Sequence, residues 1–299
     1  MITVIGSVNM DLIATTPRLP QPGETVTGTD FATAPGGKGA NQALAARRAG
    51  ATVRMVGAVG DDAFAAEALA LLDQAGANLG AVRHVDGPTG TALILVGDDG
   101  ENMIAVIPAA NAKVTAEDAE RAVAAMAADD TLLLQLEIPE EAIRAALEAA
   151  NAKGITSILN IAPLTDAVLR LAPLASIVIA NETEFSRLSG RATETLETAR
   201  AELTALHGKT GQCMIVTLGG EGVLWARDGE IGHTASLAIK PVDTVGAGDT
   251  FCGYLAQGLD AGLEFAGAVK RAAAAGALAC LKPGAQPAIP VSAEVDARL

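Results

Sequence analysis

The chain alternates between short apolar runs and longer amphipathic segments over most of its length. The apolar runs predict buried strands at residues 2–5, 52–56, 131–136, 155–159, 177–179 and 213–217. The amphipathic segments predict helices at residues 63–75, 116–128, 139–151, 251–259 and 266–281. Because strands that alternate with helices form parallel sheets with right-handed crossovers, the pattern predicts an α/β fold with a mostly parallel sheet.

A predicted β-hairpin interrupts this alternation at residues 91–96 and 102–107, which flank a Gly-Asp-Asp-Gly turn. Prolines and glycines also break the strand and helix pattern between residues 12 and 34. We expect residues of about 12–34 and 91–107 to form a small discontinuous sheet, a lid that lies over the site and excludes water. A second hairpin, around Asp-Gly, is predicted at residues 223–226 and 230–234.

The length of 299 residues and the hydrophobic content of 50% allow a large buried core, which we expect to belong to one domain over residues 1–299. The first twelve residues carry no basic residue, and no apolar run reaches the roughly 20 residues that span a bilayer. Cys213, Cys252 and Cys280 are far apart, which indicates buried free thiols rather than disulfides or a zinc site. These features predict a cytoplasmic protein with no membrane partner.

The net charge argues against nucleic acid as a partner. With 21 basic and 35 acidic residues the chain carries −14, the wrong sign for gripping nucleic acid through its phosphates. Seven aromatic residues are also few for stacking on bases. A nucleotide would have to be bound through local backbone donors and a divalent cation.

A glycine-rich turn at residues 243–250 precedes the helix predicted from residue 251. The backbone N–H groups of Gly246, Ala247 and Gly248 are expected to bind an anion, since such turns collect unpaired donors at the positive end of a helix. Asp249 beside them suits a base that takes a proton from a hydroxyl while the N–H groups hold a phosphoryl group. The alternative is that Asp249 is only an N-cap and the glycines only shape a turn.

Polar residues follow several predicted strands, where ligands bind in open α/β sheets. Asn9 and Asp11 follow the first strand and suit vicinal hydroxyls, or else they only make local bonds in a turn. Glu137 follows residues 131–136 and either faces the ligand or only charges a helix N-terminus. The segment Asn181-Glu182-Thr183-Glu184 likewise follows a strand, and its polar groups suit Mg²⁺ through water or else are first-turn acids favoured by the helix dipole.

Two more glycine-rich segments let a ligand approach the backbone. The first, residues 36–42, supplies donors from Lys38 and Asn41 ahead of a helix-like stretch at residues 43–49. The second, residues 218–222, follows a predicted strand. Neither is a P-loop, and no G-x-G-x-x-G follows a strand, so dinucleotide binding has little support.

Six motifs, in order and at matching spacing, resemble the ribokinase family of carbohydrate kinases over essentially the whole chain. The resemblance implies a Rossmann-like, doubly wound α/β domain with a β-sheet lid that pairs two subunits into a homodimer. It also implies ATP-dependent phosphorylation of a primary hydroxyl, with O5 of ribose as the expected acceptor. The motifs are Asn9-Met10-Asp11, Gly36 to Gln42, Asn181 to Glu184, Thr217 to Gly222, Asp243 to Thr250, and Gly284-Ala285-Gln286-Pro287.

The resemblance assigns roles by position. Asp249 would be the general base, and the N–H groups of Gly246, Ala247 and Gly248 the anion hole. Glu184 would act on Mg²⁺ through water. The sugar would contact Asn9, Asp11, Gly37, Lys38, Gly39, Ala40, Asn41, Glu137 and Asp249. The nucleotide would contact Asn181, Thr217, Leu218, Gly219, Gly220, Glu221, Gly222, Gly248, Asp249 and Ala273.

The resemblance further implies a monovalent cation, K⁺, beside the anion hole, and here the sequence departs from the family pattern. Ala288 stands where a hydroxyl side chain is common, so one oxygen ligand is missing. Ala273 stands near the adenine where a polar side chain is frequent, so base selectivity is expected to be loose. The cation ligands would be Asp243 and the main-chain carbonyls of Val245, Ala279, Lys282 and Gly284.

Two other functions stay open at this point. The acceptor can be another sugar, a nucleoside or a sugar phosphate, although Lys38 is the one cation available to a phosphosugar. Alternatively, the chain can be a sensor that binds sugar or nucleotide without turnover. A base beside an anion site is of little use to a protein that only binds.

Overall fold

The structure is a computed structural model that describes residues 1–193 and 195–299. Its main sheet has nine strands in the order β13-β12-β11-β10-β9-β8-β1-β4-β5. All neighbours from β11 to β5 are parallel, and β12 and β13 add antiparallel at one edge. The strands are β1 (Ile2–Ile5), β4 (Val53–Gly60), β5 (Asn78–Val85), β8 (Thr131–Leu134), β9 (Thr156–Asn160), β10 (Ile177–Asn181), β11 (Cys213–Thr217), β12 (Val223–Arg227) and β13 (Glu230–Thr234).

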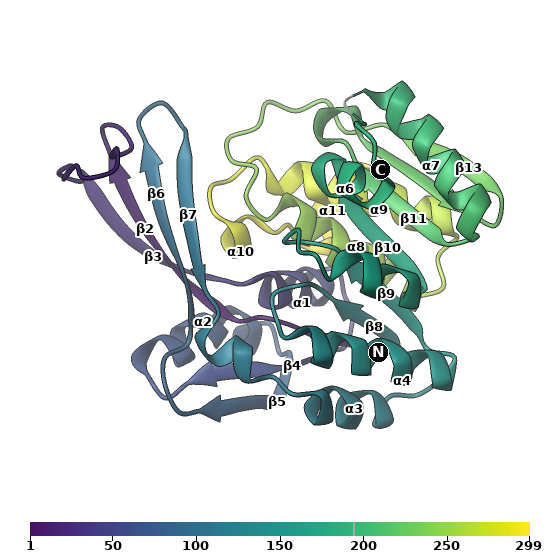
Figure 1. Cartoon of the computed structure of the whole chain (residues 1–299), viewed down its shortest axis with the longest axis horizontal. Helices are drawn as coiled ribbons and strands as arrows, with labels where there is room; N and C mark the ends of the chain where they lie inside the picture. Colours follow the sequence, from purple (N-terminus) through teal and green to yellow (C-terminus); the bar gives the residue numbers. More distant parts are fainter. Residues whose placement is uncertain (194) are drawn as a thin grey trace.

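Helices cover both faces of this sheet, so the sheet is doubly wound (Figure 1). One face packs against α1 (Lys38–Arg48), α2 (Ala63–Gln74), α8 (Ala247–Asp260) and α9 (Phe265–Ala279). The other packs against α3 (Ala116–Ala124), α4 (Glu140–Lys153), α5 (Val168–Leu171), α6 (Glu182–Ser189) and α7 (Leu196–Thr210). The short remaining helices are η1 (Ala109–Lys113), η2 (Ala172–Leu174), η3 (Gly219–Glu221), α10 (Ala285–Ala288) and α11 (Ser292–Asp296).

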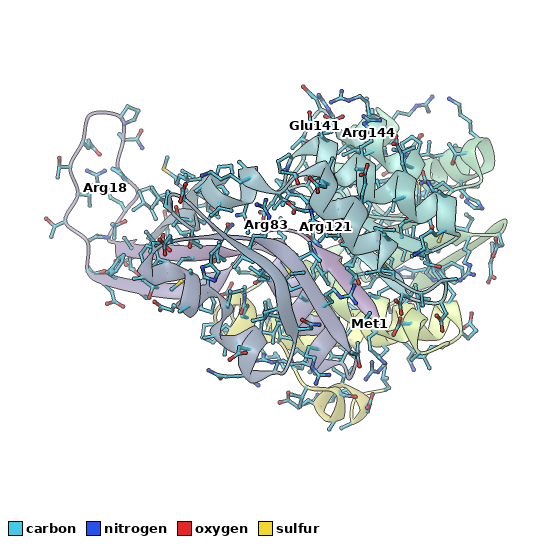
Figure 2. All side chains as sticks on the ribbon, turned by 90° about the horizontal axis from the view of Figure 1, so that it is seen from below. Met1, Arg18, Arg83, Arg121, Glu141 and Arg144 are labelled. Carbon is cyan, nitrogen blue, oxygen red and sulfur yellow. The ribbon has the colours of Figure 1, made fainter. Side chains whose placement is uncertain are left out.

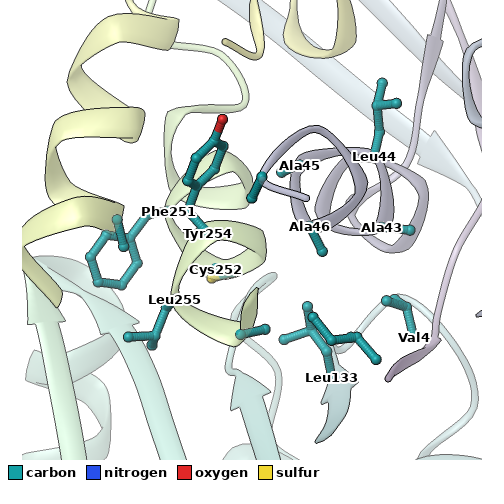
Figure 3. Packing of buried hydrophobic residues seen from close by; sticks show 14 of the residues in the cluster. Val4, Ala43, Leu44, Ala45, Ala46, Leu133, Phe251, Cys252, Tyr254 and Leu255 are labelled. Carbon is teal, nitrogen blue, oxygen red and sulfur yellow. The ribbon is translucent and has the colours of Figure 1, made fainter. Parts of the chain in front are cut away.

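Small side chains bring α1 and α8 close together over the sheet (Figure 3). Ala45 of α1 and Tyr254 of α8 are fully buried, and a Cβ on Gly253 of α8 would lie 2.5 Å from the Ala45 side chain. Because alanine places little bulk between two helix backbones, the residues at the start of each helix come within hydrogen-bond distance of one another. This packing positions the residues described below.

A second, four-stranded sheet in the order β3-β2-β6-β7 extends from the main body (Figure 1). Its middle pair is parallel and its outer pairs are antiparallel. Figure 2 shows Arg18 at the outer end of this sheet, away from Glu141 and Arg144 on the main body. The strands are β2 (Asn9–Thr16), β3 (Asp30–Gly36), β6 (Gly90–Gly97) and β7 (Asn102–Ile107).

The predicted α/β fold, the mostly parallel sheet, the separate small sheet and both hairpins are confirmed. Two helix starts were predicted too late: α1 begins at Lys38 rather than residue 43, and α8 at Ala247 rather than residue 251. In both cases glycines suggested a turn, but in the structure they lie in the first helical turn or just before it. The edge strand β5 and the helices α6 and α7 were not predicted.

Within the described residues, no helix is both long and apolar enough to cross a membrane.

Candidate active site

A cavity of about 640 Å³ opens at the carboxyl ends of β9, β10 and β11, beside the start of α8. It lies where open α/β sheets bind ligands. Asn160, which the sequence analysis did not single out, also lines it, as do apolar residues of the segment 237–241. The sequence-predicted residues on its wall are Lys38, Asn181, Glu184, Thr217, Gly219, Gly220, Gly222, Gly246, Ala247, Gly248, Asp249 and Ala273.

The turn before α8 presents backbone donors to this cavity. Gly246 is the N-cap with φ 75°, a left-handed conformation that suits glycine, and a Cβ there would lie 2.9 Å from Ala285. One of the expected donors is not open to a ligand. The Ala247 N–H donates to the Thr244 carbonyl at 3.3 Å, because the left-handed Gly246 closes a turn between these two residues. Within the described residues, the N–H groups of Gly246, Gly248 and Asp249 have no hydrogen-bond partner. The open donors are therefore these three.

Asp249 is buried in the first turn of α8. Its Oδ2 accepts from Asn41 Nδ2 and its Oδ1 from Gln42 Nε2, both at 2.9 Å. The side chain does not cap its own helix, because Gly246 holds the N-cap position. The interpretation of Asp249 as only an N-cap is therefore wrong.

Asn9 and Asp11 begin β2 rather than a turn, so the alternative of local turn bonds is wrong. Asn9 Oδ1 accepts from Asn111 Nδ2 at 2.6 Å, which turns the amide nitrogen of Asn9 away from Asn111. Asn111 in turn is held by the backbone N–H and carbonyl of Val8, at 2.9 and 3.2 Å. The Asn9 side chain is thus held so that its amide nitrogen, Nδ2, is available to donate to a ligand.

Burial and, to a smaller extent, the nearby carboxylates of Glu137 and Asp249 together raise the pKa of Asp11 to about 6. The pKa of Lys38 is raised chiefly by Asp249, against the effect of burial, with Glu137 and Glu184 adding to it. Four acids, Asp11, Glu137, Glu184 and Asp249, therefore lie near one lysine beside the cavity. The charge of Lys38 offsets part of their mutual repulsion.

Glu137 binds the start of α1. Its Oε2 accepts from Ser7 Oγ at 2.5 Å and from the Lys38 N–H at 3.0 Å, while Ser7 Oγ also accepts from the Gly39 N–H at 3.2 Å. A Cβ at Gly39 would lie 2.5 Å from the Ser7 nitrogen, so only glycine fits this close approach. Glu137 therefore anchors a helix N-terminus, a contact the sequence did not predict. Within the described residues its Oε1 has no partner.

Asn181 and Glu184 form a capping box on α6. Asn181 Oδ1 accepts from the Glu184 N–H at 2.8 Å, and Glu184 Oε2 accepts from the Asn181 N–H at 2.9 Å. Glu184 is therefore a first-turn acid, as one alternative predicted, but only its Oε2 is used in the capping box. Burial raises its pKa, and the residue also faces the cavity, so its second oxygen stays available to a ligand.

The glycine loop after β11 folds tightly, with the Leu218 N–H donating to the Gly222 carbonyl at 2.8 Å. Thr217, Gly219, Gly220 and Gly222 line the cavity, whereas Leu218 is buried in the hydrophobic core and Glu221 points to solvent. These two residues therefore lie off the cavity wall. The sequence-predicted residues that also lie off it are Asn9, Asp11, Gly37, Gly39, Ala40, Asn41 and Glu137, which surround the start of α1.

The residues expected around a monovalent cation lie behind the Gly246 turn. Asp243 accepts from the Val245 N–H at 2.9 Å and from the Gly284 N–H at 2.8 Å, which ties the two segments together. Ala279 and Ala288 are buried, and Ala288 presents a methyl group there. A carboxylate offers about four lone-pair sites, so two remain for a cation.

The sequence analysis missed Gln42, Gln135, Asn160 and Asn111 as functional residues. Gln42 lay inside a quoted motif, immediately after Asn41, and that position was a usable signal. The others carry no local signal, because their partners are 93 or more residues away in sequence.

An anion cradle and a buried carboxylate in one cavity of an open α/β sheet define a carbohydrate kinase of the α/β class. The chain belongs to the pfkB family of carbohydrate kinases, whose profile matches residues 1–292. It is 37% identical over 298 residues to the ribokinase of Bacillus subtilis (strain 168), covering 99% of this chain and 98% of the relative. A deoxyribokinase of Salmonella typhi is 36% identical over 292 residues, covering 97% and 95%.

A solved structure of this kind, Arabidopsis thaliana ribokinase complexed with ribose and ATP, matches with a TM-score of 0.88 at 32% identity. The match covers 99% of this chain and 97% of that chain.

Proposed function

We propose that this protein is an ATP-dependent ribose kinase that transfers the γ-phosphoryl group of ATP to O5 of D-ribose, giving ribose 5-phosphate and ADP. One observation carries the proposal: a buried carboxylate, Asp249, adjoins the open N–H groups of Gly246 and Gly248 in a cavity of about 640 Å³. The likeness to ribokinases over nearly the whole chain supports it.

In this proposal Asp249 takes the proton from O5 as O5 attacks the γ-phosphorus. The bond between the γ-phosphorus and the β,γ-bridging oxygen breaks, and ADP leaves. Charge that moves onto the phosphoryl oxygens faces the N–H groups of Gly246, Gly248 and Asp249 at the positive end of α8. The Lys38 ammonium adds a positive charge close by.

The sugar would bind between β2 and the start of α1. Asn9, fixed as a donor by Asn111, and Asp11, an acceptor, are two residues apart on one strand and suit neighbouring hydroxyls. Asn41, Gly37 to Ala40 and the free oxygen of Glu137 complete the sugar site in this proposal. The segment between Thr217 and Gly222, with Asn181 and Ala273, would line the nucleotide.

Mg²⁺ would be held chiefly by the phosphates and water, as is usual for kinases, with the free oxygen of Glu184 acting through water. In keeping with this, no three His, Cys, Asp or Glu side chains form a metal-binding group in the part of the chain that the structure describes. When bound, the ion neutralises phosphate charge. The three free thiols and the need for ATP fit a cytoplasmic enzyme.

The test is ADP formation that depends on added ribose, measured in a coupled assay with D-ribose, 2-deoxyribose, fructose and ribose 5-phosphate. We expect the highest kcat/KM with ribose. A higher value with 2-deoxyribose would instead favour the function named for the Salmonella relative. No ADP with any sugar would favour a sensor. The same assay with GTP tests base selectivity, which the apolar position Ala273 is expected to leave loose.

Activation by K⁺ is expected to be weak, because Ala288 supplies no oxygen beside Asp243. Ala288→Ser restores a hydroxyl at that position, so half-maximal activation should occur at a K⁺ concentration several-fold lower than in the wild type. The measurement is kcat against KCl concentration at constant ionic strength set with tetramethylammonium chloride. Equal K⁺ responses in both proteins would rule out this position as a ligand site.

We also propose a homodimer formed through the small sheet. The strand register places Phe31 of β3, which is 64% exposed, on the same face of this sheet as Leu93 of β6 and Met103 of β7, which are both about half exposed. This face therefore presents large apolar side chains to water. Such patches mark interaction surfaces, and in a dimer each sheet would also act as a lid.

Met103→Glu should convert the dimer to a monomer in light scattering after size exclusion, because it buries a charge in the interface. Asn102→Asp, at an exposed polar position of the same strand, serves as the matched control and should leave the mass unchanged. A wild-type protein that is already monomeric would contradict the dimer.

A further inference from the structure

Asp249 is held by a chain of buried amides. Gln42 Nε2 donates to Asp249 Oδ1 at 2.9 Å and to Asn160 Oδ1 at 3.0 Å. Gln42 Oε1 accepts from Gln135 Nε2 at 2.7 Å. Gln42 and Gln135 are both fully buried, and they come from α1 and from the segment just after β8.

The hydrogen bonds in this series of amides all run in one direction. Both hydrogens of the Gln42 amide nitrogen point to oxygen acceptors, and its oxygen receives a hydrogen from Gln135. Turning the Gln42 amide over would set its oxygen against the oxygens of Asp249 and Asn160, so its orientation is locked. Gln135 supports this orientation but does not impose it, because its own Oε1 has no partner within the described residues. Gln42 can therefore donate to Asp249 but cannot accept a proton from it.

Asn41, the other donor to Asp249, is not locked. Its Oδ1 is buried and has no hydrogen-bond partner within the described residues. When Asp249 Oδ2 carries a proton, the Asn41 amide can turn over and accept that proton with its free oxygen. No such exchange is open at Oδ1, where Gln42 is fixed.

We propose that Gln42, fixed by Asn160 and supported by Gln135, is a positioning residue that orients Asp249 and makes Oδ2 the oxygen that receives the sugar proton. The inference rests on the proposed function, in which Asp249 is the base. Gln42 stabilises the ionised carboxylate because its hydrogen bond to Oδ1 is stronger when the acceptor is charged than when Oδ2 carries a proton. Gln135 acts one step further away, on Gln42 alone.

The test is the pH profile of kcat at saturating ribose and ATP, from pH 5 to 9. Gln42→Leu should move the acidic limb of the profile up by about one pH unit and lower kcat by roughly 10- to 100-fold, while both KM values change by less than about threefold. Gln42→Glu has the same shape and still accepts from Gln135, but its charge repels Asp249, so its acidic limb should move further.

Gln135→Leu should shift the limb in the same direction by a smaller amount. It also keeps the test open if the Gln42 variants fold poorly. Gln212→Leu is the matched control, because it removes a half-buried amide that donates to the Ala172 and Ala175 carbonyls at the far end of the sheet. Its acidic limb should coincide with that of the wild type.

The charged and titratable groups that face Asp249 are Lys38 of α1, Asp11 of β2, Glu184 of α6 and Cys252 of α8, and none of them is altered in these variants. Unchanged acidic limbs in both Gln42 variants would overturn the positioning role, even if kcat fell. A wild type that forms no ribose-dependent ADP would instead overturn the proposed function, so the two failures are distinct.

Discussion

Asp249→Asn lowers kcat by roughly 10²- to 10⁴-fold, the usual effect of removing a general base. Asparagine has the shape of aspartate but cannot take up the sugar proton. Its oxygen can face Gln42 and its nitrogen can face Asn41, whose amide can turn over because its Oδ1 has no other partner within the described residues. The variant is therefore expected to fold as the wild type does.

The measurement combines the coupled ADP assay with thermal melting and ATP binding by calorimetry. We expect the melting temperature to change by no more than a few degrees and ATP to bind about as tightly as before. Asp249→Ala should be equally inactive but less well packed. Substantial activity in either variant would remove Asp249 as the base and the proposed mechanism with it.

Asp11→Asn should weaken sugar use and stabilise the protein at the same time. The asparagine loses a charged acceptor for the sugar hydroxyls, and hydrogen bonds to charged groups are strong, so kcat/KM for ribose should fall roughly 10²-fold or more. KM for ATP should stay within about twofold. In the wild type, KM for ribose should fall as pH rises through about 6, because Asp11 then ionises.

The gain in stability follows from the raised pKa of Asp11. The folded protein holds this proton more tightly than the unfolded chain, whose carboxyl has a pKa of 3.8. The contribution of the group to stability is therefore full below about pH 4 and is lost as pH rises through about 6. At pH 8 the ionised group costs on the order of 1 to 3 kcal/mol, which Asp11→Asn should recover.

Urea denaturation at pH 8 and at pH 5 measures this effect. The variant should exceed the wild type in free energy of unfolding at pH 8, and the difference should shrink at pH 5. Asp30→Asn, at an exposed position of the same small sheet, is the control and should alter neither value. A variant that is less stable than the wild type at pH 8 would show that Asp11 is held by contacts that favour its charge.

The sequence predicted the sheet, its two faces of helices and the small second sheet, because hydrophobic periodicity reports burial directly. It placed the starts of α1 and α8 too late. Glycine disfavours helices on average, and pattern alone cannot reveal that Gly39 must touch the Ser7 backbone or that Gly246 must close a turn.

The residues that support the candidate site were harder to predict than the residues of its motifs. Asp249 and Asn41 belong to recognisable motifs, and the structure brings them together. Gln135 and Asn111 do not, because each acts through a partner on a distant segment. Reading Ala247 as an open donor failed for a local reason, since its N–H bonds within its own turn.

Strand β2 connects the candidate site to the small sheet. Its first residues, Asn9 and Asp11, belong to the proposed sugar site, and its later residues run out along the small sheet between β3 and β6. Only Gly6, Ser7 and Val8 separate it from the central strand β1, and Val8 is bonded to Asn111. A shift of the outer sheet would therefore move Asn9 and Asp11, the residues proposed to bind the sugar. If two copies pair through this sheet as proposed, a mutation in their contact would change the preference among sugars without altering any residue of the proposed sugar site.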